Sequence, residues 1–433
     1  MSGPKRVLLV AYYYPPRQGI GARRPAHLRK YLPRFGWEAT ILTAQLAGND
    51  AAQPDVVATR YIDVLASVKR GLGLNGTPTH HRMGIAIPTA TESRTSLRHR
   101  AISLAYQACT FPDREVGWTP FALHALRELL RKERFDAVVS TSPPHTAVLV
   151  AALAKSGVPW VADVRDLWTA TDFIDREPAV RWCERRIERW MLQRASAITV
   201  TTQEAAEYLA RRFPSIPVRT IFNGFDPQEW RDIPFGRNAR CTLLFAGSLY
   251  HGRAQPALLF RAVRRLVDRR AFVPDDLSID FYSDETALVA AIAETEGVRE
   301  MVRTFDYVPR EEILPLERRA DRLLFFPWHG DGAGTALGGK VLEYLGARKP
   351  LLAIGGGASS AVDGVLAQTG AGVRCTSMEQ IESEVFTAVS EFKSGRPREL
   401  DSNAVSKFDA PRLAQQFADL LDRVTETRRS VVW

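Results

Sequence analysis

The stretch GTALGGKVLEYLGARKPLLAIGGG, residues Gly334–Gly357, combines a helical pattern with a strand pattern. A glycine-rich segment leads into an apolar stripe at helical spacing, formed by Leu337, Val341, Leu342 and Leu345. A short apolar run, Leu351–Ile354, follows and ends in three glycines. The change of period predicts a helix and then a buried strand.

The same alternation continues along the chain. Several apolar runs are uninterrupted, as is typical of parallel strands covered on both faces. Repeated alternation of strand and helix predicts an α/β protein with doubly wound sheets. The predicted strands are Val7–Ala11, Ala39–Thr43, Ala137–Ser140, Trp160–Ala162, Ile198–Thr201, Arg219–Phe222, Thr242–Ala246, Ser278–Phe281, Arg322–Phe326, Leu351–Ile354 and Gly372–Arg374.

These strands form two sets, which indicates two Rossmann-like domains. The first is expected over residues 1–222, with an irregular excursion near 70–100. Residues 223–240 hold two glycines, two prolines and many polar residues, and therefore form the expected linker. The second domain is expected over 241–405, and a last helical segment over 406–433.

Length and composition narrow the class of protein. The chain has 433 residues, 45% of them hydrophobic, and a net charge of +9, which favours anionic partners. Its four cysteines are far apart and form no CxxC pair, as expected in a reducing cytoplasm. The N-terminus is interpreted as a first strand and not a signal peptide. Apolar runs stay well below the ~20 residues of a membrane span, so we expect a soluble protein or one in peripheral membrane contact.

The opening stretch itself suggests a binding site. Gly338 and Gly339 leave the first N–H groups of the helix accessible, and such a helix start attracts phosphate. Lys340 opposes the helix dipole there, and a bound anion would remove that conflict. Glu343, one turn later, could accept hydroxyls of a ribose. The alternative is a surface Lys–Glu pair pointing away from the apolar stripe, which contributes only a few tenths of a kcal/mol.

Two other turns follow predicted strands. In LLFAGSLYHGRAQPALL, Gly247 and Ser248 form a turn, and Arg253 stands where the next helix begins. An arginine there can hold a phosphate by charge-assisted hydrogen bonds. In YYYPPRQGIGARR, Gly19 and Gly21 permit a tight turn before a helix near Ala22, where backbone N–H groups can approach an anion. The alternative is an ordinary turn.

Polar residues also gather at strand ends in the first half. In STSPPHTAVL, Thr141 or Ser142 can cap a helix whose first turn carries His145. In PWVADVRDLWT, Asp163, Arg165 and Asp166 come just past a strand. They are expected to line a cleft, or else Asp163 and Arg165 form a salt bridge.

Two helices combine basic and apolar residues. The first carries Arg23, Arg24, Arg29, Lys30 and Arg34. The second, RWCERRIERWMLQR, has Trp182, Ile187, Trp190 and Met191 among its arginines. Such faces can rest on anionic lipid. The alternative is that the apolar residues face the core and the arginines are solvated.

Some chemistries leave no trace in the sequence. There is no Asp-x-Asp triplet and no histidine cluster, so a protein-held metal is not expected. No phosphate-binding Walker motif or GxSxG elbow is present. No fold signature for nucleic-acid binding accompanies the basic charge.

Together, YYYPPRQGIGARR, STSPPHTAVL, PWVADVRDLWT, IFNGFD, FAGSLYHGRAQPALL, DYVPREEILPLERRADRLLF and GGKVLEYLGARKPLLAIGGG resemble the GT-B glycosyltransferases of the family 4 type, in a bacterial branch with a G-x-K-x-x-E-Y donor motif. The resemblance covers nearly the whole chain. It implies two Rossmann-like domains facing a cleft, with a last helix that crosses back to the first domain. The C-terminal domain would bind the nucleotide sugar and the N-terminal domain the acceptor.

The resemblance also implies residue roles. Glu343 matches the ribose-binding glutamate of the E-x7-E motif, whose first position is Thr335 here. Arg253 stands in place of a diphosphate-binding lysine, and Lys340 compensates for Ser248 at the usual arginine position. Asp166 falls on the acceptor side. The donor-binding set is Gly19, Gly21, Gly247, Ser248, Arg253, Thr335, Leu337, Gly338, Gly339, Lys340 and Glu343. The catalytic candidates are Arg253, Lys340, Asp166 and His145, and the acceptor-side set is Asp163, Arg165 and Asp166.

The preferred hypothesis is a retaining glycosyltransferase that needs no metal or other cofactor and acts in polysaccharide or glycoside biosynthesis. Its partners would be a nucleotide-sugar donor and an acceptor glycan, lipid-linked sugar or small glycoside. A sugar-nucleotide epimerase of the same fold and a non-catalytic nucleotide-sugar binder remain alternatives.

Overall fold

The computed structural model describes residues 3–17, 19–46, 53–64, 66–67, 107, 109–170, 178–249, 256–327, 339–356 and 361–431. Its contacts divide the chain into two compact units. Unit 1 comprises 1–221 and 414–433, and unit 2 comprises 222–413. The excursion predicted near 70–100 lies outside the described residues.

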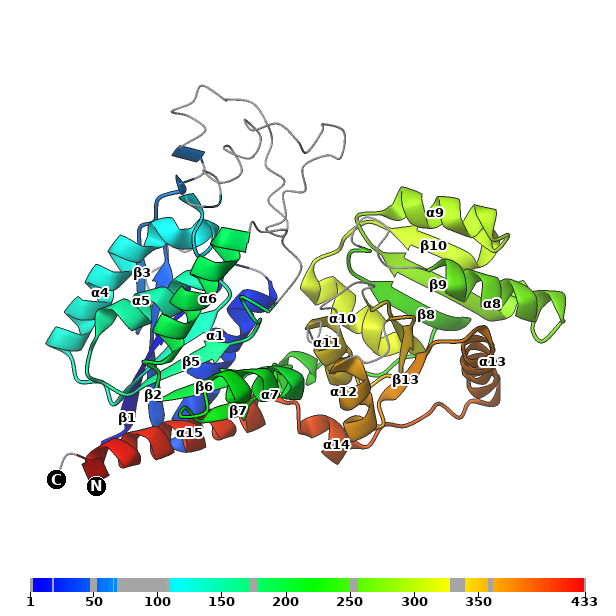
Figure 1. Ribbon diagram of the computed structural model, residues 1–433. Coiled ribbons are helices and arrows are strands. Elements are labelled where there is room, and N and C mark those ends of the chain that lie inside the picture. Colours follow the sequence, from blue (N-terminus) through cyan, green and yellow to red (C-terminus); the bar gives the residue numbers. More distant parts are fainter. Residues whose placement is uncertain are drawn as a thin grey trace, which may run out of the picture. The chain divides into compact units, whose positions relative to one another are not determined.

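Unit 1 contains a parallel sheet in the order β3-β2-β1-β4-β5-β6-β7 (Figure 1). Its strands are β1 (Lys5–Val10), β2 (Trp37–Ala44), β3 (Val56–Thr59), β4 (Ala137–Ser142), β5 (Trp160–Val164), β6 (Ala197–Val200) and β7 (Val218–Thr220). Its helices are α1 (Ile20–Tyr31), α4 (Thr119–Lys132), α5 (Thr146–Ala154), α6 (Pro178–Leu192), α7 (Gln203–Arg212) and α15 (Ala410–Val431).

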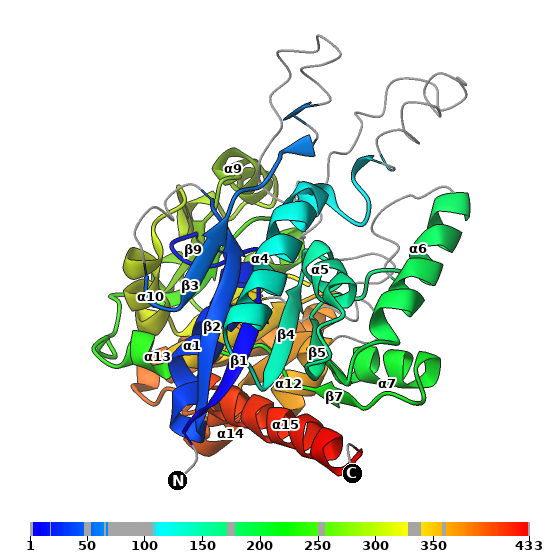
Figure 2. The same cartoon turned by 90° about the vertical axis from the view of Figure 1, so that its left-hand side faces the viewer.

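The two faces of this sheet have different coverings (Figure 2). Leu8, Val10 and Ala162 pack in one cluster with side chains of α4, α5, α6 and α7. Because neighbouring strand residues point to opposite faces, Asp163 points the other way, toward α1. The last helix also belongs to unit 1, since Asp422 of α15 accepts hydrogen bonds from Lys5 Nζ at 2.6 Å and Trp37 Nε1 at 3.1 Å. The chain thus returns to its first domain, as the resemblance implies.

Unit 2 contains a second parallel sheet in the order β10-β9-β8-β11-β12-β13. Its strands are β8 (Cys241–Ala246), β9 (Leu277–Tyr282), β10 (Val302–Phe305), β11 (Arg322–Phe325), β12 (Leu351–Ile354) and β13 (Gly372–Cys375). Its helices are α8 (Ala257–Asp268), α9 (Thr286–Thr295), α10 (Arg310–Arg319), α11 (Gly339–Ala347), α12 (Ala361–Thr369), α13 (Met378–Ser394) and α14 (Ser402–Ser406).

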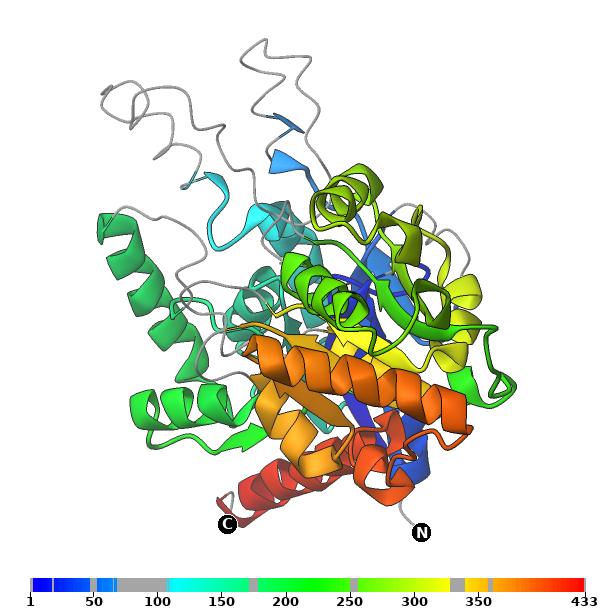
Figure 3. The ribbon, with the colours of Figure 1, turned by 90° about the vertical axis from the view of Figure 1, so that its right-hand side faces the viewer.

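This second sheet is buried on both faces. Leu243 and Phe245 of β8 pack with α8, α9 and α13, the long orange helix in the foreground of Figure 3. Leu244 and Ala246 alternate with them and pack with α10, α11 and α12. Each unit is therefore a doubly wound α/β layer structure, which confirms the predicted fold class.

All eleven predicted strands are present, with ends that differ by a few residues. The sequence analysis missed β3 and β10, which lie at the edges of their sheets. Edge strands are covered less completely, and Arg303 of β10 is exposed. β3 has no buried residue and β10 has one, so neither has the fully buried apolar run that identified the central strands.

Candidate functional site

The first turn of α11 lies beside the end of β8. A Cβ atom placed on Gly247, directly after β8, would be 3.9 Å from Lys340 Cε. The N–H of Ala246 donates to the hydroxyl of Tyr344 at 3.2 Å. These contacts place Lys340 at the carboxyl edge of the sheet, where α/β proteins commonly bind ligands.

Lys340 belongs to a network of five charged side chains. Its Nζ lies 2.5 Å from Glu343 Oε1 and 3.4 Å from Glu317 Oε1. The other carboxylate oxygen of Glu343 accepts from Arg310, whose Nη2 also lies 2.6 Å from Glu229 Oε2. The network thus joins α11 to α10 and to the segment after β7.

Burial distinguishes this network from a surface ion pair. The Glu343 side chain is 2% exposed, whereas that of Lys340 is 35% exposed. The expectation that Glu343 points away from the buried side of its helix was wrong, because Glu343 reaches inward to Arg310. Lys340 is the partly exposed end of a buried charge network, so its ammonium can reach a ligand.

The remaining predicted donor residues fall into two groups. Ser248 Oγ donates to Glu285 Oε2 at 3.1 Å, and the N–H of Leu249 donates to the same oxygen at 2.6 Å. Glu285 therefore holds the turn after β8. Gly339 opens α11. Arg253, Thr335, Leu337 and Gly338 lie outside the described residues.

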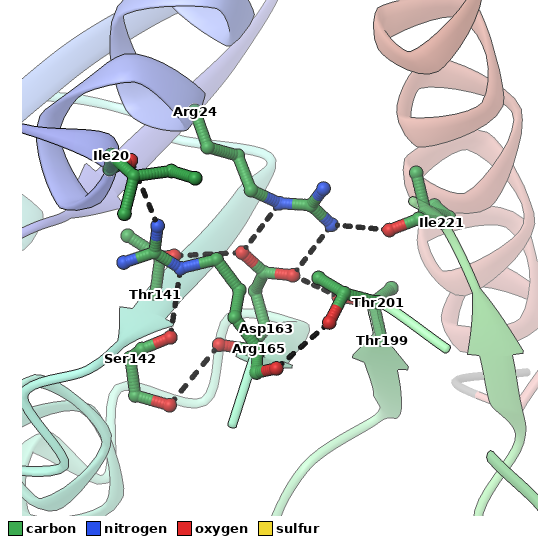
Figure 4. Close-up of polar contacts among 9 residues, drawn as sticks. All are labelled: Ile20, Arg24, Thr141, Ser142, Asp163, Arg165, Thr199, Thr201 and Ile221. Atoms are coloured by element: carbon green, nitrogen blue, oxygen red, sulfur yellow. Dashed lines mark hydrogen bonds and ion pairs between the residues drawn. The ribbon is translucent and has the colours of Figure 1, made fainter. Parts of the chain in front are cut away.

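Asp163 is the centre of a buried cluster in unit 1 (Figure 4). It accepts from Arg24 Nε at 2.9 Å and Nη2 at 2.8 Å, and from Thr141 Oγ1 and Thr199 Oγ1, both at 2.7 Å. Burial alone raises the pKa of Asp163, but the Arg24 guanidinium, together with the charge of Arg165 and the Thr141 hydroxyl, holds that pKa below its ordinary value. Asp163 lies within β5, not past its end, and its ion-pair partner is Arg24, not Arg165. It braces the sheet against α1 and does not line a cleft.

Arg165 connects several chain segments at the same edge of the sheet (Figure 4). Its Nε donates to the carbonyl of Ser142 at 2.8 Å, its Nη2 to that of Pro143 at 3.1 Å, and its Nη1 to that of Ile20 at 3.4 Å. Asp166 is exposed to solvent, although the dense protein around it raises the pKa of its carboxyl against the opposing charge of Arg165. Of the three predicted acceptor-side residues, Asp166 alone is exposed.

His145 immediately precedes α5, and the residue that caps this helix is not one of the two predicted. Asp113 caps it, because Asp113 Oδ2 accepts from the N–H of Thr146 at 2.9 Å and Asp113 Oδ1 accepts from the Thr146 hydroxyl at 2.5 Å. Thr141 and Ser142 belong to β4 and cap nothing. The His145 ring stacks on Trp168 with centroids 5.3 Å apart, and burial lowers the pKa of His145 to about 4. The imidazole is therefore neutral at pH 7.

Several residues at the carboxyl edges of the two sheets were not predicted from the sequence. Arg310 and Glu317 complete the network around Lys340, while Asp113 lies beside His145. Glu115 Oε1 accepts from Tyr13 OH at 2.8 Å, and burial with the nearby Glu115 charge raises the pKa of Asp113 to about 7. The Asp-Arg-Glu spacing in FPDREVGW was a visible signal, but its partners are remote in the chain.

The two glycines after β1 differ in role. Gly19, with φ +123°, precedes α1, which begins at Ile20, two residues before the predicted start near Ala22. A Cβ on Gly21 would lie 3.1 Å from Tyr13 Cδ2, so a side chain there would displace the ring. Packing against Tyr13 explains Gly21 without any ligand.

The basic helices mostly turn their apolar side chains inward. In α6, Met191 is buried, Ile187 and Trp190 pack against the core, and Trp182 is 59% exposed. In α1, Arg24 is buried against Asp163 and was wrongly placed on a solvated face. The apolar stripe of each helix is therefore largely used in packing.

The described residues show neither a metal site nor a membrane-spanning helix. They contain no group of three or more His, Cys, Asp or Glu side chains placed to hold a metal ion. None of the helices in the described part of the chain is long and apolar enough to cross a membrane.

Comparisons with known proteins agree with this geometry. The two sheets and their order define a GT-B fold, and solved structures that cover nearly the whole chain share it. Sucrose-phosphate synthase from Thermosynechococcus elongatus has a TM-score of 0.63 at 13% identity, covering 98% of this chain and all of that one. The lipopolysaccharide glycosyltransferase WaaG has a TM-score of 0.56 at 17% identity, covering 96% and 99%. A Listeria monocytogenes protein assigned as a UDP-N-acetylglucosamine 2-epimerase has 0.54 at 14%, covering 96% and 95%.

A family model adds information at the sequence level. Residues 19–224 match the model of the Glycosyl transferase 4-like domain. No curated protein sequence matches the chain significantly. The matched region and the fold together support a glycosyltransferase.

Proposed function

We propose that this protein transfers a sugar from a nucleotide-sugar donor to an acceptor hydroxyl, with retention and without a metal, in bacterial polysaccharide or glycoside biosynthesis. The observation that carries the proposal is the charge network at the start of α11. Lys340 is partly exposed at the carboxyl edge of a parallel sheet and is anchored by two buried carboxylates.

The network suits a leaving nucleoside diphosphate. Breaking the glycosidic bond moves negative charge onto the diphosphate and leaves an oxocarbenium-like sugar. A fixed ammonium and the N–H groups of a helix start stabilise such charge where it develops. In this proposal Lys340 and Arg253 face the diphosphate, and Glu343 accepts the ribose hydroxyls.

Glu343 has a second task under this proposal. Its carboxylate receives both Lys340 and Arg310, so it fixes the direction of the ammonium. Ribose hydroxyls would compete with these cations for the same oxygens. Since a carboxylate offers about four lone-pair sites, it can accept a hydroxyl and keep one cation.

On the acceptor side, the candidates are Asp166 and His145 of unit 1. Asp166 is exposed, and a neutral His145 can accept a proton from a hydroxyl. Measuring release with candidate acceptors distinguishes a glycan, a lipid-linked sugar and a small glycoside.

A sugar-nucleotide epimerase is the second candidate. The GT-B neighbour from Listeria monocytogenes carries that assignment, and the buried acids Glu317 and Glu343 lie at the same site. An epimerase would use carboxylates as acid and base and would need no acceptor.

The deciding experiment has two stages. A thermal-shift panel of UDP, GDP, ADP, CDP and dTDP sugars identifies the donor, because ligand at 100 times its Kd adds about 2.7 kcal/mol of stability. Nucleoside diphosphate release is then measured in EDTA, with and without candidate acceptors. Acceptor-dependent release in EDTA supports a metal-independent transferase, whereas conversion of the donor into an epimeric nucleotide sugar, without net release of nucleoside diphosphate, supports the epimerase.

A further inference from the structure

Unit 2 contains a cavity of about 560 Å³ away from the start of α11. It is bounded by the segment after β7, the end of α10, the end of α11 and the chain after α13. Six of its lining side chains are cationic, against three carboxylates: Arg231, Arg318, Arg322, Arg348, Lys349 and Arg398. The wall therefore carries a surplus of positive charge.

Two of these arginines are buried with donors left over. Arg318 is 9% exposed and Arg322 is 3% exposed. Arg318 Nη1 donates to the carbonyl of Trp230 at 2.6 Å, and Arg322 Nη2 lies 2.8 Å from Glu391 Oε2. The Nε atoms of both have no hydrogen-bond partner among the described residues. Buried N–H groups of charged side chains without an acceptor are costly, so negative charge placed nearby would stabilise both arginines.

The carboxylates at the wall do not neutralise it. Asp321 accepts from the N–H of Thr242 at 2.8 Å, and burial raises the pKa of its carboxyl. Burial lowers the pKa of the nearby Lys349 against the opposing charge of Asp321, and the charges of Arg318 and Arg322 act in the same direction as burial. A bound anion would relieve this mutual repulsion.

Arg348 occupies a strained position on the same wall. It follows α11 with φ +55°, in the left-handed region where glycine is the favoured residue. An arginine there is less favourable than glycine because its Cβ crowds the backbone. The chain thus has an arginine at a position where the backbone conformation favours glycine.

An aromatic ring lines the cavity as well. Phe235 is 58% exposed, and the guanidinium of Arg318 lies 4.1 Å from its centroid. The volume exceeds what a single inorganic phosphate fills, and falls within the range of small-molecule sites. One guanidinium group can bind two phosphate oxygens at once, and the aromatic face of Phe235 can cover the organic part of the ligand.

This cavity is distinct from the proposed donor site. Arg322 begins β11 and Lys349 lies two residues before the start of β12, so the cavity lies at the amino edge of the parallel sheet. Gly346, also on its wall, is six residues beyond Lys340 in α11, about 9 Å along the helix. We propose that the cavity is a second anion site that binds a small phosphate ester.

The test compares two arginines that share the same backbone strain. Arg270 is exposed, has φ +56° and is not among the cavity-lining residues. Arg348→Gly and Arg270→Gly each remove one positive charge and relieve the same strain, so neither is expected to unfold the protein. Binding of glucose 1-phosphate, uridine 5′-monophosphate and inorganic pyrophosphate is measured by calorimetry in both, and the three probes distinguish sugar phosphates, nucleotides and free phosphates.

We expect Arg348→Gly to weaken binding of at least one probe about 10-fold or more at the cavity, since a charge-assisted hydrogen bond is lost. Arg270→Gly should bind as the wild type does. Lys340→Ala should still bind the probe at the cavity and lose only binding at the donor site, so the two proposals can fail separately. Equal affinities of the Arg348→Gly and Arg270→Gly proteins for all three probes would overturn the proposal.

Discussion

At the residue scale, burial decides what each charged side chain does. Lys340 and Glu343 are three residues apart, as in many surface ion pairs, yet Glu343 is buried beside Arg310. Asp163 and Arg165 are two apart, yet Arg24 holds Asp163. Spacing along the chain identified charged residues of interest but not their partners.

Replacing Lys340 by alanine tests the donor site. We expect turnover to fall on the order of 10²–10³-fold, because a preorganised cation that stabilises the leaving diphosphate is lost. Arg253→Ala should show a loss of similar size. The control is Lys393→Ala, an exposed lysine 2.5 Å from Asp276 in the same unit. Nucleoside diphosphate release measures both, and wild-type turnover in Lys340→Ala would remove it from the mechanism.

A second prediction concerns two ion pairs of nearly equal length. Arg24 Nη2 lies 2.8 Å from Asp163 Oδ1, and Arg131 Nη2 lies 2.7 Å from Glu128 Oε1. The Arg24 side chain is 6% exposed and that of Arg131 is 72% exposed. Arg24→Ala should lower the free energy of unfolding by about 3–5 kcal/mol, because it strands a buried carboxylate. Arg131→Ala should cost less than about 1 kcal/mol. Urea unfolding of both variants measures this, and equally small losses would contradict the structural role of Arg24.

His145 gives a pH-dependent prediction. Its folded pKa of about 4 lies below the ordinary value, so between about pH 6.5 and 4 the unfolded chain binds more protons. The stability linked to His145 is complete above this window and is lost as pH falls through it. The raised pKa of Asp113 changes the stability in the opposite direction, and it does so in both the wild type and the His145→Asn variant.

In His145→Asn this loss on acidification should disappear. The variant should therefore gain on the wild type by on the order of 1–3 kcal/mol between pH 7 and 4. Urea unfolding at several pH values measures the difference. Parallel stability curves for the two proteins would show that His145 is not held neutral.

At the element scale, pattern and position determine which structures sequence can reveal. The central strands are buried on both faces, and their apolar runs identified them. The edge strands β3 and β10 are partly exposed and lack such runs. The start of α5 was misjudged for another reason, because its cap comes from Asp113, which is remote in sequence.

Alanine substitutions at two helical glycines in unit 2 are predicted to have opposite effects on stability. A Cβ on Gly346 of α11 would lie 2.2 Å from Trp230 Nε1, while one on Gly364 of α12 would meet nothing within 4 Å. Gly346→Ala should therefore destabilise by about 1–3 kcal/mol through overpacking. Gly364→Ala should stabilise by about 0.5–1 kcal/mol, since alanine loses less backbone entropy in a helix. Thermal unfolding measures both, and shifts of the same sign would refute the packing of α11 on Trp230.

At the scale of the whole molecule, the question is where the protein finds its acceptor. We predict salt-sensitive binding to anionic liposomes through α6, because Trp182 is exposed and Arg186 lies 4.7 Å from its ring centroid. Trp182→Ala should weaken co-sedimentation at low salt. Phe386→Ala, which removes an exposed aromatic ring from α13 in unit 2, should not. Equal recovery with anionic and neutral vesicles would favour a soluble acceptor.

The sequence by itself determined the α/β class, eleven of the strands and the two sheets they form. These follow from the local alternation of apolar and polar residues, which burial imposes on neighbours along the chain. It also indicated Lys340 and Glu343, since a glycine-rich helix start with a lysine is a local pattern.

Only the tertiary structure decided which charges meet. Arg310 and Glu317 join the network of Lys340 from another helix, and Arg24 reaches Asp163 from α1, which is far away in sequence. The cavity lined by Arg318, Arg322 and Arg348 likewise assembles from separate segments. Partner choice among charges depends on which segments the fold brings together and on how far burial excludes water, and neither property is encoded in local spacing.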